Sequence, residues 1–334
     1  MVSKPVLLVG GSGVIGRQTA EYLRACHPTL PLLIGARDVD KAHRTAQDIG
    51  NAEAVRIDLS ADDLGLGATA VSAVVMFLMD QRMTSLRYAL SRRVPYLSFS
   101  SAIQEMSLEV ALYLHDREAA PVVLGTEWLV GATTLPILHL AKTFERLTDI
   151  KVGALIDEND TSGPATYEDL GRLAEVLPAA MARRDGVFCW RTTGEPAPVF
   201  KAIDGTLIEA APFSAYDVAS LAAATNAANI EFNLATAVTS STRRGEAPST
   251  EIIIELSGIG MDGNHRAIRH AIAHPQGQRM VTSTGVSMLT ARMLGLDGAP
   301  APAPGLYFPY QLLDPEAYLE RLKQNGGELI ELEV

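Results

Sequence analysis

The first residues of the chain, KPVLLVGGSGVIGRQTAEYL (residues 4–23), decide its fold. A short apolar run meets a cluster of glycines and continues into a pattern with helical spacing. Gly10, Gly13 and Gly16 have GxxGxxG spacing, and a GxGxxG pattern begins at Gly11. Glycines between a buried strand and a helix permit a tight turn and the close approach of a pyrophosphate, which the helix N-terminus binds. The stretch therefore predicts a dinucleotide-binding turn.

Short apolar runs alternate with amphipathic stretches through the first part of the chain. Strands are expected at residues 6–9, 32–34, 54–57, 74–78, 96–99 and 122–124, with helices between most of them. Strands without internal alternation, separated by helices, are typical of a parallel sheet that is buried on both faces. We therefore expect an α/β fold, a Rossmann-type doubly wound parallel sheet with right-handed crossovers.

The pattern changes after residue 147. Strands become more frequent, and helices are expected only at 167–183, 216–224, 279–294 and after Asp314. This part predicts a second α+β domain with a largely antiparallel sheet. The last strand, ELIELEV (328–334), is expected to rejoin the first sheet. The predicted domains are residues 1–147 (Rossmann), 148–277 (α+β, substrate binding and dimerisation) and 278–334 (a C-terminal segment returning to the Rossmann domain).

The second strand favours one cofactor over the other. It ends in LLIGARD (32–38), where an NAD site usually carries an acidic residue that binds the ribose hydroxyls. Here Arg37 follows Gly35 and Ala36, and a planar guanidinium can bind a 2′-phosphate. Asp38 competes for the ribose, but it also stands where the next helix needs an N-cap. NADP(H) is therefore favoured over NAD(H).

Residues after the first five strands are expected to lie along the cofactor, because ligands bind at the carboxyl ends of such strands. Asp58 can contact the adenine amino group or serve only as a surface turn. The predicted cofactor residues are Gly10, Gly11, Ser12, Gly13, Val14, Ile15, Gly16, Arg37, Asp38, Asp58, Leu59, Phe77, Leu78, Met79, Ser98 and Ser100.

Composition limits the function classes. The 334-residue chain has a net charge of −11, which argues against a nucleic-acid partner because phosphate neutralisation needs clustered cations. Its two cysteines, Cys26 and Cys189, form no metal-ligand motif, so no metal is expected. We find neither a signal-peptide pattern nor an apolar run long enough to span a membrane. These features predict a cytoplasmic protein with a small-molecule substrate.

The chain resembles the saccharopine dehydrogenase-like oxidoreductases. The similarity runs through VLLVGGSGVIGRQTAEYL, IGARDVDKA, VPYLSFSS, APVVLGTEWLVGATTLP and GLYFPYQLLDPEAYLERLKQNGGE. The resemblance implies a Rossmann domain, an inserted α+β domain and hydride transfer with a nicotinamide cofactor. This chain has Ser98 where the family usually has an acidic residue, Val130 where it has proline, and Tyr310 where it often has glutamate. It is similar to a diverged member with a substrate other than saccharopine.

The candidate catalytic residues are Glu127, Asp80 and Tyr167, because hydride transfer to a double bond needs one proton donor. Each has a structural alternative: either carboxylate can bind backbone N–H groups, and Tyr167 can pack its ring at a helix start. Arg266 is either part of a cationic patch for an acidic substrate or an exposed strand residue. The predicted substrate residues are Trp128, Tyr167, Arg266 and Tyr310.

Three functions are compatible with these features. The first is NADPH-dependent reduction of a C=N bond in a biosynthetic pathway, such as an imine or the condensation product of an amine and a carbonyl. The second is NADPH-dependent reduction of a C=C or C=O bond, and the third is a non-catalytic NADP-binding sensor. A homodimer that pairs edge strands of the second domain across a two-fold axis is also expected.

Overall fold

The structure is a computed structural model that describes residues 4–99, 105–160, 171, 179–191 and 194–334. The chain forms two compact units. The first comprises Met1–Thr126 and Thr282–Leu313, and the second comprises Glu127–Val281 and Asp314–Val334. Each unit is built on its own sheet.

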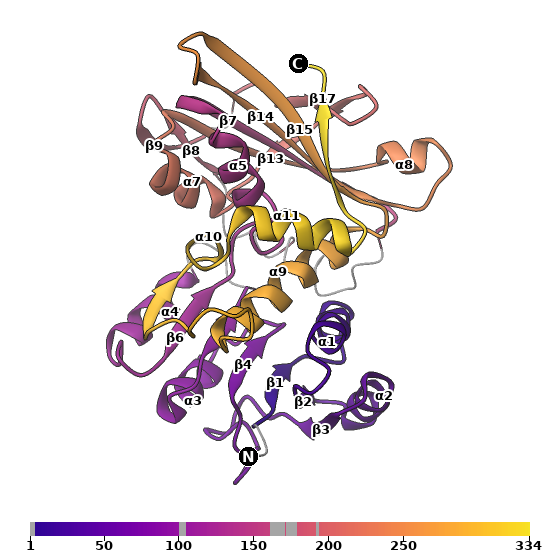
Figure 1. The fold of residues 1–334 in the computed structure, drawn as a ribbon, viewed down its shortest axis with the longest axis vertical. Helices are drawn as coiled ribbons and strands as arrows, with labels where there is room; N and C mark the ends of the chain where they lie inside the picture. The colour runs from indigo at the N-terminus through magenta and orange to yellow at the C-terminus, as the bar shows by residue number, and fades with distance from the viewer. Residues whose placement is uncertain (1–3, 100–104, 161–170, 172–178, 192–193) are drawn as a thin grey trace. The chain divides into compact units, whose positions relative to one another are not determined.

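The sheet of the first unit has seven parallel strands in the order β16-β6-β5-β4-β1-β2-β3. The order 3-2-1-4-5-6 is that of the Rossmann fold, so the predicted fold class is confirmed. The strands are β1 (Val6–Val9), β2 (Leu32–Ala36), β3 (Ala52–Arg56), β4 (Ala73–Met76), β5 (Tyr96–Ser98), β6 (Pro121–Leu124) and β16 (Gly305–Tyr307) (Figure 1). The sheet reverses its order between β1 and β4, which makes the carboxyl ends of these two strands the expected ligand site.

Helices connect these strands. They are α1 (Val14–Cys26), α2 (Val39–Ile49), α3 (Thr84–Arg92), α4 (Met106–Leu114), most of α9 (Gln278–Met293) and α10 (Pro309–Leu312). The start of α1 is held by α9, where the hydroxyl of Ser283 donates to the carbonyl oxygen of Ile15 at 3.2 Å. None of the described helices is long and apolar enough to cross a membrane.

The sheet of the second unit has the order β17-β15-β14-β7-β13-β8-β9, with β12 paired to β13. Only β7 and β13 run parallel, so a largely antiparallel sheet is also confirmed. The strands are β7 (Phe144–Asp157), β8 (Met181–Arg184), β9 (Val187–Trp190), β12 (Ala211–Pro212), β13 (Asn229–Ala237), β14 (Thr250–Gly260), β15 (His265–His274) and β17 (Glu328–Leu332). The domain boundary predicted at residue 147 thus lies inside strand β7.

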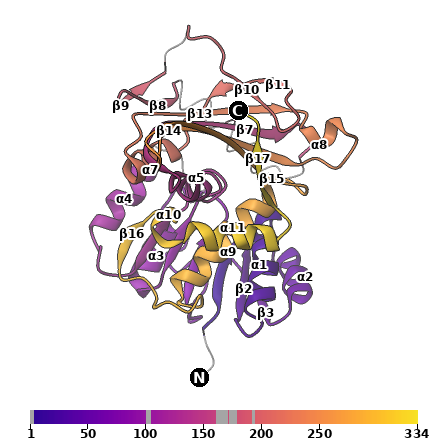
Figure 2. The ribbon, with the colours of Figure 1, turned by 45° about the horizontal axis from the view of Figure 1, so that its top comes forward.

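The two faces of this second sheet are covered differently. Figure 2 shows a two-stranded sheet, β10 (Val199–Lys201) and β11 (Leu207–Glu209), on one face, and α5 (Thr134–Ala141) and α7 (Asp217–Thr225) on the other. Phe200 of β10 packs on Gly153 so closely that a Cβ at Gly153 would lie 2.5 Å from its ring. The unit also contains α8 (Ser240–Arg243) and α11 (Pro315–Gln324).

Two sequence predictions are corrected in this unit. The helix expected at 167–183 falls partly outside the described residues, and its last residues, 181–183, belong to strand β8. A two-residue turn at Asp185 and Gly186 pairs that strand with β9. The final strand, β17, joins the second sheet through β15 and not the first sheet. Its alternating pattern specifies a strand but not which sheet edge receives it.

Candidate cofactor and active site

The glycine turn between β1 and α1 depends on close backbone contacts. Gly10 has a φ of +86°, and its N–H donates to the carbonyl oxygen of Gly35 in β2 at 2.7 Å. A Cβ on Gly16 would lie 2.5 Å from the oxygen of Gly10 and 2.7 Å from the Cα of Gly11. Only glycine at position 16 allows α1 to begin directly against the turn.

The start of α1 has room for an anion. Gly13 is the N-cap residue and has no side chain to bind the first N–H groups of the helix, which also lack acceptors within the helix. A Cβ on Gly13 would approach only the oxygen of Gly10, at 3.1 Å. Ser12 is buried, whereas Val14 is exposed. The arrangement fits a pyrophosphate bound by backbone N–H groups at the helix N-terminus.

Arg37 and Asp38 have different roles at the end of β2. One carboxylate oxygen of Asp38 accepts the N–H groups of Asp40 at 3.1 Å and Lys41 at 3.0 Å, so Asp38 is the N-cap of α2. Arg37 is exposed and forms no hydrogen bond or ion pair with another described residue. The free cation at this position is therefore Arg37, while the neighbouring acid is committed to the helix.

Asp58 and Leu59 lie in the turn after β3. Asp58 is exposed, and its Oδ1 accepts the N–H of Ser60 at 2.9 Å and its hydroxyl at 2.5 Å. These bonds from Ser60 lower the pKa of the Asp58 carboxyl. Leu59 is half-buried. The observed contacts of Asp58 are those of a turn residue.

The residues after β4 lie directly against the glycine turn. The N–H of Phe77 donates to the oxygen of Val9 at 2.9 Å, and a Cβ on Gly10 would lie 3.2 Å from the Cβ of Phe77. Leu78 contacts the same glycine, and both residues are half-buried, as is Met79. The structure thus brings an apolar surface together with the predicted pyrophosphate site.

Asp80, a predicted proton donor, supports the start of α3. Its buried carboxylate accepts the N–H of Arg82 at 3.0 Å and both the N–H and the hydroxyl of Ser85 at 2.8 Å. The Ser85 hydroxyl lies 3.2 Å from the hydroxyl of Tyr96 in β5. Asp80 thus binds backbone N–H groups at the start of α3, as expected for a structural carboxylate. We therefore do not propose it as a proton donor.

A carboxyl group approaches the end of β5 from another element. The hydroxyl of Ser98 donates to Oε1 of Glu109 in α4 at 2.6 Å, and both side chains are buried. Sequence reasoning missed Glu109, although it is the only acidic residue in MSLEVALYL, the otherwise apolar sequence of α4. Position 98 thus lacks the acidic side chain usual in the resembled family, yet a carboxyl group reaches it from α4.

Glu127, in the second unit, is a buried acid whose carboxyl group lies near the hydroxyls of Thr134 and Ser220. The residue is 2% exposed, and neither carboxyl oxygen forms a hydrogen bond of normal geometry with a described residue. By contrast, the buried Asp157 accepts hydrogen bonds from Thr239 and Thr242. Burial first, and then the charge of Asp217, raise the pKa of Glu127 well above its usual range. Burial therefore favours the protonated form of Glu127.

Asp217 is the second member of this pair, and sequence reasoning missed it. It begins α7 and accepts the N–H of Trp128 at 2.7 Å, the hydroxyl of Thr134 at 3.2 Å and that of Thr133. Burial raises the pKa of Asp217 to about 6, partly offset by these hydrogen bonds. The pKa values of both carboxyl groups are therefore raised, in each case chiefly by burial.

The residues after Glu127 adopt an uncommon backbone. Leu129, Val130 and Gly131 have φ values of +48°, +61° and +93°. A β-branched residue such as Val130 is strained in this region, and strain of this kind is concentrated at functional sites. The ring of Trp128 packs at 5.4 Å from that of Phe213, and at 5.5 Å from a second phenylalanine ring. The segment thus holds an aromatic side chain next to a buried acid.

Comparisons with known proteins support one fold. No protein-family model and no curated protein sequence matches the chain. Among solved structures, apo saccharopine dehydrogenase (L-Glu forming) from Saccharomyces cerevisiae has a TM-score of 0.68 at 15% identity, covering 99% of this chain and 100% of the other. The chain has the saccharopine dehydrogenase fold.

Two further structures share the saccharopine dehydrogenase fold with this chain. Homospermidine synthase from Legionella pneumophila, in complex with NAD, has a TM-score of 0.65 at 9% identity and covers 100% of this chain and 92% of its own. GenD2 from gentamicin A biosynthesis, also in complex with NAD, has a TM-score of 0.51 at 15% identity, covering 100% and 97%. The fold expected from the resemblance in sequence is therefore confirmed.

The remaining candidates that the structure describes, Arg266 and Tyr310, belong to different units. Tyr167 and Ser100 lie outside the described residues. Arg266 is exposed on β15, with its guanidinium 5.9 Å from the centre of the Phe144 ring. Tyr310 is half-buried in α10. In the described part of the chain, no group of three or more His, Cys, Asp or Glu side chains could hold a metal ion.

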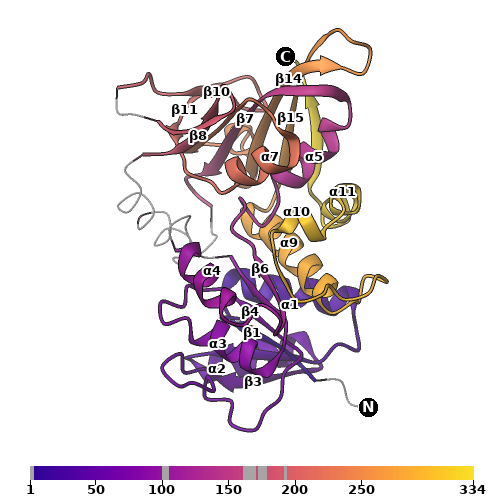
Figure 3. The same ribbon diagram turned by 90° about the vertical axis from the view of Figure 1, so that its left-hand side faces the viewer.

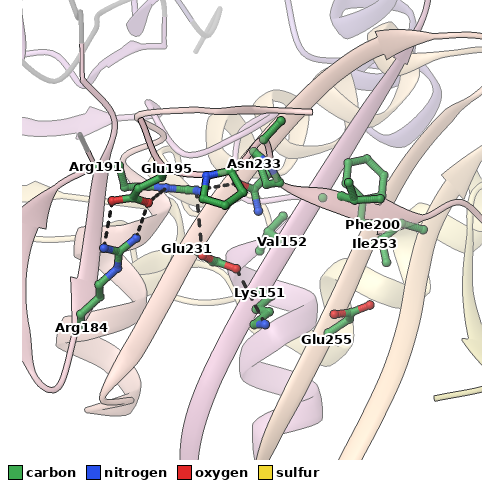
Figure 4. A pocket seen from close by; sticks show the side chains of 15 residues that line it. Lys151, Val152, Arg184, Arg191, Glu195, Phe200, Glu231, Asn233, Ile253 and Glu255 are labelled. Atoms are coloured by element: carbon green, nitrogen blue, oxygen red, sulfur yellow. Dashed lines mark hydrogen bonds and ion pairs between the residues drawn. The ribbon is translucent and has the colours of Figure 1, made fainter. Parts of the chain in front are cut away.

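A hollow of about 480 Å³ lies on the β10–β11 side of the second sheet (Figure 4). Its charged residues neutralise one another: Arg184 binds Glu195 at 2.6 Å, Arg191 lies 3.9 Å from Glu231, and Lys151 lies 4.0 Å from the same carboxylate. Each of these three cations already has an acidic partner. Among its described lining residues the hollow therefore offers no unpaired cation to an anionic substrate, and we do not place the active site there.

Proposed function

We propose that this protein is an NADPH-dependent oxidoreductase that reduces a C=N bond in a biosynthetic pathway. The observation that carries the proposal is the hydrogen bond between Ser98 and Glu109 at the carboxyl end of β5. A C=N bond accepts hydride readily only when its nitrogen is protonated, and the resulting cation is stabilised by a nearby carboxylate. Neutral C=O and C=C substrates gain no comparable stabilisation from Glu109.

The protein's own residues would bind the cofactor and handle the proton. The glycine turn holds the pyrophosphate, and Phe77 and Leu78 form an apolar wall next to it. The cofactor, when bound, supplies the hydride to the substrate carbon and leaves as NADP⁺. The substrate nitrogen gains one proton, for which we propose Glu127 as the donor because it is buried, its pKa is raised and it follows β6 by three residues.

Preference for NADPH rests on Arg37. Its guanidinium is exposed at the end of β2 and has no partner among the residues that the structure describes, and Asp38 is the N-cap of α2. Arg37→Ala is expected to weaken NADPH binding about 10- to 100-fold, because a charged hydrogen bond contributes roughly 1.5–3 kcal/mol. NADH binding should change little, since NADH lacks the 2′-phosphate.

Titrations of nicotinamide fluorescence with the wild type and the variant measure this difference. Lys41→Ala is the matched control, because Lys41 is also an exposed cation near the start of α2. Equal affinity of the wild-type protein for NADH and NADPH would contradict the role of Arg37.

The proposed C=N substrate is tested by Glu109→Gln. This variant keeps the side-chain shape and an acceptor for Ser98 but cannot carry the negative charge on which the proposal depends. We expect kcat/KM for imines to fall about 100-fold, a loss typical of one electrostatic contact to a developing or stabilised charge. NADPH affinity should remain within about threefold, because the change is at the substrate end of the cofactor.

The assay measures the rate at which NADPH absorbance decreases with each member of a substrate panel. The panel contains cyclic imines, 2-oxoacid and amine pairs, enones and ketones. Glu118→Gln, at an exposed glutamate after α4, is the control. An equal loss on imines and ketones would assign Glu109 a merely structural role.

A C=C or C=O reductase is the second candidate. The half-buried Phe77, Leu78 and Met79 next to the glycine turn favour an apolar substrate. Faster turnover of enones or ketones than of imines in the same panel would support this alternative.

A further inference from the structure

The outer edge of β9 is an unusual surface. β9 is the last strand of the second sheet, and no described strand pairs with its outer side (Figure 1). Its sequence is Val-Phe-Cys-Trp, with Val187 66% exposed and Phe188 and Trp190 each 52% exposed. Edge strands are normally protected by charged residues or proline, as β17 at the other end of this sheet is by Glu328 and Glu331.

The turn before β9 determines which backbone groups point outward. Asp185 and Gly186 have φ values of +50° and +80°, so they form a type I′ turn that makes Arg184 and Val187 a hydrogen-bonded pair. Hydrogen-bonded pairs alternate along an antiparallel ladder. The alternation continues to Arg191, whose N–H donates to the oxygen of Ala180 at 2.8 Å.

It follows that Phe188 and Trp190 direct their N–H and C=O groups away from β8. Their partners across the ladder, Arg183 and Met181, occupy the non-hydrogen-bonded positions. β9 therefore presents two donors and two acceptors, two residues apart, at an exposed apolar edge. These groups can be satisfied by water or by another strand.

We propose that β9 pairs antiparallel with β9 of a second copy of this chain, around a two-fold axis at Cys189. Residues opposite each other in an antiparallel pair have side chains on the same face of the sheet. A two-fold axis normal to the sheet must therefore lie between one residue and the same residue of the second copy, and cannot fall midway between two consecutive residues of a strand. An axis at Cys189 places Phe188 opposite Trp190 of the second copy, and Trp190 opposite Phe188 of the second copy. All the outward-pointing groups are then satisfied by identical groups of the other copy.

The neighbouring axis position is excluded by a hydrogen bond. An axis at Phe188 would place Gly186 opposite Trp190 of the second copy in a hydrogen-bonded pair. The N–H of Gly186 already donates to the oxygen of Ala228 at 2.9 Å. Pairing around Cys189 therefore satisfies the edge better than pairing around Phe188.

The side chains also match a second copy. Phe188 and Trp190 lie on the same face of β9, so the pairing brings four aromatic rings together. On the opposite face of this edge, Val187 lies across from Arg184, which lines the hollow next to the β10–β11 sheet (Figure 3). Val199 of β10 lines the same hollow and is 53% exposed. Exposed apolar side chains thus occur on both faces near the edge, which allows a contact larger than one short strand, as a stable dimer requires.

Cys189 makes the proposal testable by cross-linking. Around this axis the two Cys189 residues face each other in a non-hydrogen-bonded pair, where Cα atoms lie about 4.5 Å apart. This separation is within the range that a disulfide spans. Mild oxidation of the purified protein with copper phenanthroline should give a covalent dimer on a non-reducing gel. The dimer should persist in Cys26→Ser and be absent in Cys189→Ser.

Light scattering gives the second measurement. The wild type should have twice the chain mass of 35.7 kDa, and Trp190→Lys should have the single-chain mass while still binding NADPH. Met261→Lys is the control, because Met261 is also an exposed apolar residue, in the turn after β14. A monomeric wild type overturns the proposal. The proposal is also overturned if the Cys26→Ser variant is a dimer but does not form the Cys189 cross-link. This holds whatever mass Trp190→Lys has.

Discussion

Glu127→Gln is expected to lower kcat about 100- to 1,000-fold and at the same time to stabilise the protein at pH 8. Glutamine has nearly the shape of a protonated glutamate but cannot donate an acidic proton. General-acid catalysis by one side chain contributes roughly 10²–10⁴-fold. The hydroxyls of Thr134 and Ser220 lie near the Glu127 carboxyl group, and the amide oxygen of a glutamine can accept from the same hydroxyls.

The gain in stability follows from the sign of the pKa shift. Burial and Asp217 raise the pKa of Glu127 in the folded protein, so the folded state binds more protons than the unfolded state. The free energy of unfolding then falls as the pH rises from the unfolded pKa to the folded one, by about 1.4 kcal/mol per unit. Asp217 adds a similar decrease that ends near pH 6, its folded pKa.

Urea denaturation at pH 5 and pH 8, together with steady-state kinetics, measures both effects. The variant should show a smaller loss of stability between the two pH values than the wild type. An unchanged kcat would remove Glu127 from the proton-transfer step. Greater loss of stability in the variant would mean that Glu127 is charged in the folded protein.

Gly16→Ala is expected to abolish measurable NADPH binding and to lower Tm by several degrees. The added Cβ would lie 2.5 Å from the oxygen of Gly10, so the turn and α1 must separate. Overpacking of this kind typically costs about 1–3 kcal/mol, and here both neighbours are backbone atoms that cannot change rotamer. The separation would also displace the N–H groups that bind the pyrophosphate.

Gly13→Ala is the matched variant for this prediction. Its Cβ would approach a single atom, at 3.1 Å, so its Tm should stay close to that of the wild type. Its methyl group would nevertheless project where the pyrophosphate approaches and weaken NADPH binding. Thermal melts and fluorescence titrations of the two variants separate the packing role of Gly16 from the ligand role of Gly13. Unaltered NADPH binding in both variants would contradict the assignment of the turn.

The parts of the site that could be predicted from the sequence are those made by neighbours in the chain. The glycine turn, the N-cap role of Asp38 and the parallel strands of the first sheet all follow from patterns within about ten residues. Local spacing specifies such features because the interacting groups are fixed by the same helix or strand.

The carboxyl pair could not be predicted because its contacts join distant segments. Asp217 binds the N–H of Trp128, which is 89 positions away. Glu109 reaches Ser98 only because α4 turns one particular face toward β5. A sequence identifies such acids as candidates, but only the packed structure decides whether each accepts several close hydrogen bonds, as Asp217 does, or forms none of comparable geometry with the described residues, as Glu127 does.

The capping of α2 by Asp38 links helix stability to cofactor choice. An engineer who wished to change this chain to NADH could not simply turn Asp38 toward the ribose. Its oxygen holds two N–H groups at the first turn of the helix, and loss of an N-cap costs about 1 kcal/mol. A new acid would have to be introduced at Ala36 or Arg37. Coenzyme exchange would thus require a second carboxylate in this short segment, with Asp38 left in place.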